Sequence, residues 1–282
     1  MRVGVIGHLG WVGRAQAALF KDALCYDVAD PNSDPEAYNA DVVFVCVPSD
    51  PTPDGSLDMS RVEDVVKKCG DGVIAIRSTL NPGTADYLSV KYKKKLVIIP
   101  EYTGMSPAHP NTNMSERTFL IFGGAQKDVD RVIQVYTKVN NANTKIRRVT
   151  PRQAEIIKLT ENRAIAFKVM QMHELYLACK ASGEDYYEIR DAVYSDDWRF
   201  NLWFTFIYED EDTGKEKLGF EYSHCLSKDL PAWCAWLESL RIDPAITRKL
   251  VLKSKEWYGR SSGEILEERK ITNHRVENGV YS

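Results

Sequence analysis

The first twenty residues carry the pattern that most restricts how this chain can fold. Residues 2–6 (RVGVI) have the composition of a short buried strand, residues 7–13 form a glycine-rich turn, and residues 14–20 favour a helix. A strand that turns on glycines directly into a helix is the opening unit of a sheet with helical crossovers. The sequence therefore predicts an α/β fold.

The alternation of strand and helix patterns continues through the first half of the chain. Apolar runs typical of strands buried on both faces of a parallel sheet occur at residues 41–48, 73–77, 96–99 and 119–124. Ser60 and Glu63 have capping-box spacing at the start of an intervening helix. We expect a Rossmann-type doubly wound parallel sheet, with Thr79 and Glu101 at the carboxyl edge where ligands bind.

The glycine turn has the spacing G-x-x-G-x-x-G. Glycines let the backbone approach a pyrophosphate, whose charge then lies against the first amides of the helix. Asp27 ends the second predicted strand, where a carboxylate can accept hydrogen bonds from ribose hydroxyls and repel a 2′-phosphate; it can also be a turn or cap residue. With the glycines, Asp27 indicates NAD as the cofactor. The predicted cofactor-binding residues are Gly7, Gly10, Trp11, Val12, Gly13, Asp27, Pro48 and Thr79.

A capping box at Thr150 and Gln153 predicts a long helix that extends to about Ser182. We take it as the start of a second, mainly helical domain, with an NAD-binding domain at residues 1–149, a helical central domain at 150–258 and a polar tail at 259–282. Glu155, Lys158 and Asn162 recur at spacings of three and four, so they project from one face of the long helix. That face can be an exposed charged stripe or can line a cleft.

Composition excludes several classes of protein. A net charge of -3 with mixed signs argues against a general nucleic-acid binder. No apolar run approaches the ~20 residues needed to cross a bilayer, and the start lacks the features of a secretory signal, so we expect a cytoplasmic protein without membrane partners. The six cysteines have no paired spacing, which favours reduced thiols over a disulfide framework or a metal site.

A candidate site for covalent chemistry surrounds Cys225. This cysteine lies just ahead of a helical pattern, with Lys228 and Asp229 within one turn. A thiol can add to an aldehyde, a lysine can stabilise charge on oxygen, and a carboxylate can position a proton or a water. A cysteine at such a junction is also common as a small buried hydrophobic residue, so the stretch alone leaves both interpretations open.

Six landmarks in order give the chain a resemblance to the UDP-glucose/GDP-mannose dehydrogenase family, from residue 1 to about residue 258. They are the glycine turn, Val45-Cys46-Val47-Pro48, Ser78-Thr79, Pro100-Glu101, the helix with Lys158 and Asn162, and Cys225-x-x-Lys228-Asp229. The family oxidises a nucleotide-sugar alcohol to a carboxylate in two hydride transfers to NAD. The resemblance implies that Cys225 traps the aldehyde and that Glu101 activates the water that hydrolyses the thioester.

The same resemblance assigns the remaining site residues. Lys158 and Asn162 would bind the sugar and stabilise oxyanions, Asp229 would orient a catalytic water, and Thr79 would line the site near that water and the nicotinamide. Two residues complete the expected substrate-binding set: Lys228 and Arg199.

The chain also departs from the family pattern. The family has a third, C-terminal domain, whereas this sequence stops soon after the central helices. Met105 occupies the position of a second glutamate, Glu221 and Tyr222 replace glycines that precede the cysteine, and the glycine turn has one extra residue. We therefore expect a minimal or diverged member.

Three functions follow from these features. The first is an NAD-dependent nucleotide-sugar 6-dehydrogenase, most simply UDP-glucose to UDP-glucuronate, that acts as a homodimer through the central helices. The second is a single-step hydroxyacid-type dehydrogenase in which Cys225 is idle. The third is a cofactor-binding or oligomerisation module that has lost catalysis.

Overall fold

The structure is a computed structural model that describes residues 1–102, 114–140, 142–195, 201 and 204–268. These residues form two compact units, Met1–Thr160 and Glu161–Ser282. The division lies inside a single long helix, and each unit has its own hydrophobic core. No helix among the described residues is both long and apolar enough to span a membrane.

The first unit is built on a seven-stranded sheet with the order β2-β1-β3-β4-β5-β6-β7. The strands are β1 (Val3–Ile6), β2 (Leu24–Tyr26), β3 (Val42–Val45), β4 (Val73–Ile76), β5 (Lys95–Ile98), β6 (Phe119–Gly124) and β7 (Lys145–Val149). The expected α/β fold is confirmed. The chain order reverses between β1 and β3, which places a topological switch point next to the glycine turn.

The sheet is mixed, which corrects the expectation of an entirely parallel one. β1 to β5 are parallel, β6 pairs antiparallel with β5, and β7 is parallel to β6. A parallel neighbour needs a long crossover, usually a helix, and the only regular element described between β5 and β6 is the short 3-10 helix η2 (Met114–Glu116). The sequence pattern also missed β7, because its charged and largely exposed residues are those of an edge strand.

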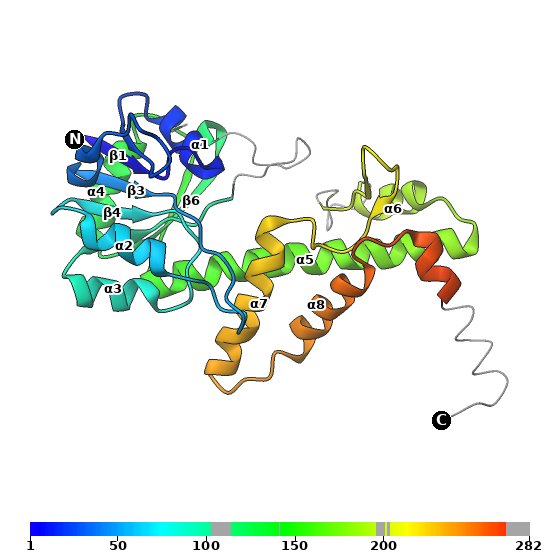
Figure 1. Ribbon diagram of the computed structural model, residues 1–282. Helices are drawn as coiled ribbons and strands as arrows, with labels where there is room; N and C mark the ends of the chain where they lie inside the picture. The colour runs from blue at the N-terminus through cyan, green and yellow to red at the C-terminus, as the bar shows by residue number, and fades with distance from the viewer. Residues whose placement is uncertain (103–113, 141, 196–200, 202–203, 269–282) are drawn as a thin grey trace. The chain divides into compact units, whose positions relative to one another are not determined.

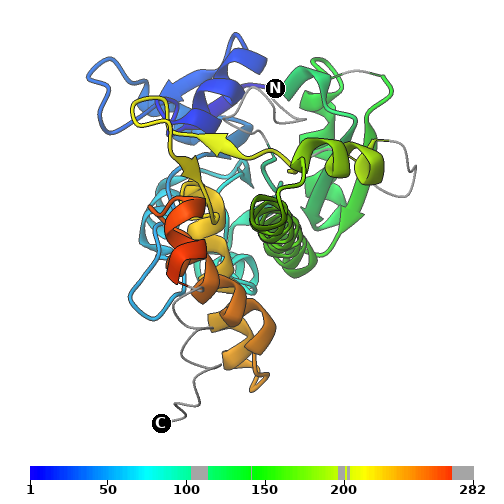
Figure 2. The same cartoon turned by 90° about the vertical axis from the view of Figure 1, so that its right-hand side faces the viewer.

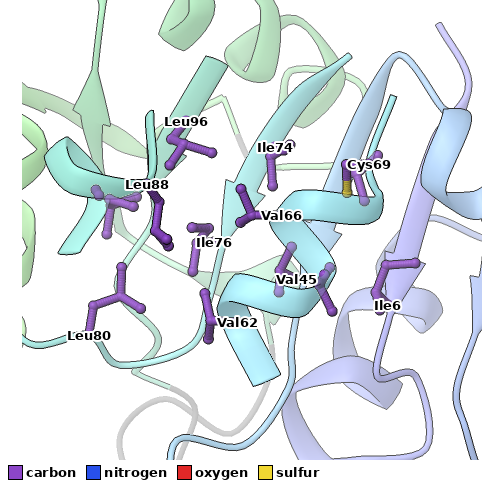
Figure 3. Packing of buried hydrophobic residues seen from close by; sticks show 14 of the residues in the cluster. Ile6, Val45, Val62, Val66, Cys69, Ile74, Ile76, Leu80, Leu88 and Leu96 are labelled. Carbon is purple, nitrogen blue, oxygen red and sulfur yellow. The ribbon is translucent and has the colours of Figure 1, made fainter. Parts of the chain in front are cut away.

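Helices cover both faces of the sheet (Figure 1). α1 (Trp11–Leu19) and α4 (Gln126–Tyr136) pack on one face, while α2 (Ser60–Lys68) and α3 (Thr84–Tyr92) pack on the other. Figure 3 shows the second interface, where Val62 and Val66 of α2 and Leu88 of α3 meet inward-facing strand residues. A 3-10 helix, η1 (Pro35–Asn39), precedes β3.

The predicted capping box of α2 is not formed. The Ser60 amide donates to the Asp58 carboxylate at 2.8 Å, and Asp58 Oδ2 also accepts from the Ser60 hydroxyl. Glu63 instead accepts from Lys91 and Tyr92 at 2.6 and 2.7 Å. The Ser60 amide, which the capping box would have paired with the Glu63 side chain, therefore binds the Asp58 carboxylate, two residues before the start of the helix.

The second unit is mainly helical. The long helix α5 (Pro151–Ser182) starts at the predicted capping box, in which the Thr150 amide donates to Gln153 Oε1 at 2.9 Å. It is followed by α6 (Tyr186–Tyr194), the hairpin of β8 (Tyr208–Glu209) and β9 (Glu216–Lys217), α7 (His224–Ser239) and α8 (Ala245–Trp257). Figures 1 and 2 show α7 and α8 as neighbours joined by a short link.

Part of the expected polar tail belongs to the second core. Residues 262–268 are helical, and Ile265 is only 3% exposed among the apolar residues of this unit. The Ser262 hydroxyl also donates to Glu216 of β9 at 2.8 Å. Two adjacent apolar residues, Ile265 and Leu266, among polar and charged neighbours gave too weak a periodicity to predict this helix.

Candidate functional site

The glycine turn between β1 and α1 forms a close-packed backbone cradle. Gly7 has a φ of 86°, which favours glycine, and a Cβ at this position would lie 2.8 Å from the carbonyl oxygen of Cys46. A Cβ on Gly13 would overlap the carbonyl oxygen of Gly7, so the third glycine lets α1 pack against the turn. Gly10 is the N-cap of α1 and Trp11 its first residue, half exposed. A glycine turn that leads into a helix N-terminus is a backbone arrangement that can bind a pyrophosphate group.

Asp27 connects β2 to this cradle. Its carboxylate accepts from the Leu9 amide at 3.2 Å and from the Ala29 amide at 3.0 Å. Leu9 belongs to the extra length of the turn, whose His8 ring lies 3.0 Å from the Asp30 carboxylate. Asp27 is thus a turn residue in the structure and also lies beside the glycine turn, so both sequence interpretations of it are compatible with this geometry.

Glu101 lies at the carboxyl edge of β5 in a buried cluster of charges. It is 8% exposed and forms ion pairs with the guanidinium groups of Arg77 and Arg117, each through a different carboxylate oxygen. The Tyr102 amide also donates to Glu101 Oε1 at 2.7 Å. Two adjacent cations favour the ionised carboxylate and fix its orientation.

Sequence reasoning missed both arginines that bind Glu101. Arg77 directly follows the apolar strand β4 and is 3% exposed, so a charge immediately after a buried apolar run was the signal present in the sequence. Arg117, which precedes β6 and is equally buried, carries no such pattern. A buried charge requires a partner, but sequence spacing does not say which one.

Lys158 is brought into the neighbourhood of Glu101 within the first unit. Its side chain is buried in the first turns of α5, and its Nζ lies 5.1 Å from the ring centroid of Tyr102, the residue that follows Glu101. One turn before it, Glu155 accepts from the amides of Gly83 and Ala85 at 2.5 and 2.8 Å. This face of α5 is therefore packed and polar, which excludes an exposed charged stripe.

Asn162, Lys228 and Asp229 form a second buried polar cluster in the helical unit. Asp229 is 0% exposed; it accepts from Lys228 Nζ at 2.6 Å and from Asn162 Nδ2 at 2.5 Å. The contact joins α5 to α7 across 67 positions of sequence. The structure thus brings together three of the residues that the resemblance assigned to the site.

Cys225 is the second residue of α7 and is exposed. Ser223 caps this helix by accepting from the Leu226 amide at 3.3 Å. Lys228 and Asp229 follow within one turn, as the sequence predicted, but they face the buried side of the helix. The exposure of Cys225 removes the alternative that it is a small buried hydrophobic residue.

The other five cysteines contrast with Cys225. Cys46 is buried, and burial raises the pKa of its thiol to about 12. Cys25 and Cys234 are half-buried, Cys69 and Cys179 are buried, and all six thiols are free. All six cysteines lie among the described residues, and of these Cys225 alone is exposed, as a thiol that meets a substrate must be.

Several predicted residues lie apart from these clusters. Thr79 follows β4 at the expected edge and is half-buried, whereas Pro48 after β3 is exposed. Val12 packs with the core under α1. Arg199 and Met105 fall outside the described residues.

The arrangement can supply three chemical functions. The glycine cradle can hold a diphosphate, an exposed thiol is available for addition to a carbonyl, and lysine and amide groups are fixed in buried positions by carboxylates. The described residues contain no cluster of ligands for a metal ion.

Comparison with known proteins identifies the central segment. Residues 152–253 match the central domain of the UDP-glucose/GDP-mannose dehydrogenase family, so the resemblance seen in the sequence is confirmed. UDP-glucose 6-dehydrogenase of Pseudomonas aeruginosa is 25% identical over 251 residues, which is 82% of this chain and 52% of that protein. GDP-mannose 6-dehydrogenase of the same species is 28% identical over 178 residues, 56% of this chain and 40% of that protein. The chain thus spans about half the length of these relatives or less.

Solved structures show the same fold. A UDP-glucose dehydrogenase from Pyrobaculum islandicum matches with a TM-score of 0.73 at 22% identity, over 91% of this chain and 68% of that one. A ternary complex of GDP-mannose dehydrogenase from Pseudomonas aeruginosa matches with a TM-score of 0.62 at 21% identity, over 91% and 69% of the two chains.

Proposed function

On the premise that residues 152–253 are a central domain of the UDP-glucose/GDP-mannose dehydrogenase family, we propose that this chain is an NAD-dependent nucleotide-sugar 6-dehydrogenase. It oxidises a sugar alcohol to a carboxylate by removing four electrons. UDP-glucose is the proposed substrate, after the relative with the longer match, and a homodimer through the central helices is the proposed assembly.

The glycine cradle supports NAD as the cofactor. The positive φ of Gly7 and the close approach of the backbone at Gly13 require glycine at these two positions, as a turn that brings the backbone to a pyrophosphate does. Asp27, beside the turn, favours ribose hydroxyls over a 2′-phosphate. When bound, NAD supplies the hydride acceptor for each of the two oxidations.

The residues of the chain supply the remaining chemistry. In the first oxidation, the hydroxyl proton passes to a water molecule while the carbon transfers its hydride to the bound NAD, and Lys158 stabilises the charge on that oxygen. The aldehyde then adds the thiol of Cys225, forming a carbon–sulfur bond and a thiohemiacetal hydroxyl. Transfer of a second hydride from the same carbon to NAD, with transfer of the thiohemiacetal hydroxyl proton to water, gives a thioester, which holds the substrate until water attacks.

Hydrolysis completes the proposed cycle. Water adds to the thioester carbonyl, the carbon–sulfur bond breaks, and the thiol of Cys225 is restored with release of the carboxylate. Glu101 is the proposed base for that water. Its two arginine partners fix its orientation and favour the carboxylate, which is the form that accepts a proton. Asp229 fixes Asn162 and Lys228, through which it acts on the substrate.

One observation carries this proposal. The exposed Cys225 at the start of α7 is followed within one turn by Lys228 and Asp229, which form a buried cluster with Asn162 of α5. A single-step dehydrogenase does not need the thiol, and an inactive module needs neither. A substitution of Cys225 therefore distinguishes the proposed function from both alternatives.

The test compares the wild type with Cys225→Ala, using NAD and a panel of UDP- and GDP-sugars. We expect the variant to lose formation of the sugar carboxylate by about 10³-fold or more while it retains NAD binding. If carboxylate or NADH forms equally fast without the thiol, the covalent mechanism is wrong. If neither protein acts on any sugar although both bind NAD, the dehydrogenase proposal is wrong.

A further inference from the structure

The segment that leads to Cys225 is held at two consecutive backbone amides. The Gly219 amide donates to His173 Nδ1 of α5 at 2.9 Å, and the Phe220 amide donates to the Ser254 hydroxyl of α8 at 2.8 Å. Both bonds are buried. A segment without regular structure is thus attached to two different helices of the second unit.

Packing leaves this segment little freedom. Gly219 has a φ of 83°, and a Cβ there would lie 2.8 Å from the carbonyl oxygen of Ser254. Leu218 and Phe220, on either side, are 0% and 2% exposed in the core of the unit. The backbone at Gly219 is therefore in close contact with α8, and only glycine fits the conformation without strain.

Hydrogen bonds continue from this point to the helix that carries the thiol. The carbonyl of Phe220 accepts from the Ser223 amide at 2.9 Å, which closes a turn. The hydroxyl of Ser223 then accepts from the Leu226 amide and caps α7, in which Cys225 is the second residue. A continuous series of contacts joins His173 to the first turn of α7.

His173 is suited to hold this segment because it stays neutral. The side chain is 3% exposed, and burial lowers the pKa of the imidazole to about 4. Near pH 7 the ring carries one proton, and because Nδ1 accepts from Gly219, that proton is on Nε2. A protonated ring would present a donor to the Gly219 amide and break the contact.

We propose that His173 is a positioning residue for Cys225: it fixes the Gly219–Phe220 backbone, and through it the N-terminus of α7 from which the thiol meets the substrate. The proposal rests on the proposed role of Cys225 as the nucleophile. His173 acts through the backbone of Gly219 and Phe220, without direct contact with the thiol or the reacting carbon.

The test uses two substitutions of His173 in the full chain. In His173→Asn the side-chain oxygen can occupy the place of Nδ1 and accept from Gly219, whereas His173→Leu removes the acceptor and leaves the amide unsatisfied. We measure amide hydrogen exchange of the peptide that contains Gly219 and Phe220, together with kcat and the KM values for the sugar nucleotide and for NAD.

We expect the leucine variant to exchange this peptide at least 10-fold faster and to lose about 10²-fold in kcat, with little change in the KM for NAD. The asparagine variant is expected to recover most of both losses. Equal loss in the two variants, or faster exchange with unchanged kcat, would contradict a positioning role.

A second variant and a measurement independent of turnover complete the test. If His173→Leu does not fold, Ser254→Ala removes the neighbouring anchor at Phe220 with a smaller change, and the same exchange and kcat effects are expected. If the wild type shows no activity with any sugar, the proposed function fails. The exchange measurement then still decides whether His173 holds the segment, because it does not depend on turnover.

Discussion

Two buried carboxylates, one in each unit, have different partners. Glu101 in the α/β unit lies between two guanidinium groups, those of Arg77 and Arg117. Asp229 in the helical unit lies between one ammonium group and one neutral amide. Glu101 is 8% exposed and Asp229 is 0% exposed.

The difference lies in what remains when the carboxylate charge is removed. Without the charge of Glu101, two buried cations face each other across a neutral group. Without the charge of Asp229, one buried cation remains beside an amide that can reorient. Because the cost of a buried unpaired charge far exceeds the net value of an ion pair, the Glu101 cluster should be the more sensitive of the two.

The largest expected effect is that of Glu101→Gln. We predict a loss of about 3–5 kcal/mol in the free energy of unfolding, measured by urea denaturation at pH 7. Glu36→Gln is the matched control, because the pair of Glu36 with Arg2 spans 3.9 Å between side chains that are each 60% exposed. A loss no larger than that of the control would show that the two arginines do not depend on Glu101.

Asp229→Asn is expected to cost less, about 2 kcal/mol in the same assay. The amide oxygen can still accept from Lys228 or Asn162, and only one cation loses its counter-charge. A loss larger than that of Glu101→Gln would reverse the comparison and make the helical cluster the more critical one.

The helical unit should also lose stability in acid. The pKa of His173 is about 4 in the folded chain, below an unfolded value of about 6.5, so the unfolded state binds the proton first as the pH falls. Stability present above pH 6.5 is therefore lost toward pH 4, at up to about 1.4 kcal/mol per pH unit. We predict a loss of about 2 kcal/mol between pH 6.5 and 5.

His173→Asn provides the check on this pH dependence. The variant has no titrating group at this position, so the difference between its stability and that of the wild type should change with pH over that window. A constant difference would show that His173 is not the group responsible.

The α/β unit contains a group with the opposite dependence. Burial raises the pKa of Glu155 to about 7. The hydrogen bonds from the amides of Gly83 and Ala85 favour the ionised form, but they offset only part of the effect of burial on the pKa. The folded state then retains a proton that the unfolded state releases near pH 4.3, so stability falls as the pH rises from about 4.5 to 7.

We predict that this loss amounts to about 2 kcal/mol between pH 5 and 6.5, where the slope approaches about 1.4 kcal/mol per pH unit. The protection factors of the α3 amides, which compare the observed exchange rates with the intrinsic rates at each pH, should fall over this range because Glu155 binds the first turn of α3. In Glu155→Gln the protection factors should stay constant over the same range. Protection that rises with pH in the wild type would give the wrong sign and contradict the assignment.

The sequence predicted the parts of the fold that depend on local patterns. Glycines at fixed spacing, apolar strand runs and the Thr150–Gln153 box located β1, α1 and the start of α5, and the structure agrees with each. It could not predict that β6 is antiparallel to β5, because strand direction depends on the path of the connection. β7 was missed because an exposed edge strand carries no apolar pattern.

The candidate site was predictable only as a set of residues. Motif order identified Glu101, Asp229 and Cys225, but the partners of these residues come from distant positions. Arg117 reaches Glu101 from 16 residues away and Asn162 reaches Asp229 from 67, with no spacing rule to connect them. His173 gave no signal at all, since a histidine in a long helix has the pattern of an ordinary core residue.

The central claim is that the chain carries out two oxidations on one carbon through a covalent bond to Cys225. The most direct measurement is the amount of NADH formed per molecule of sugar nucleotide consumed, with purified protein, excess NAD and UDP-glucose first in the panel. We predict two NADH per sugar in the wild type. One NADH per sugar would contradict the claim in favour of a simple alcohol dehydrogenase, and none with any sugar would contradict the enzyme assignment itself.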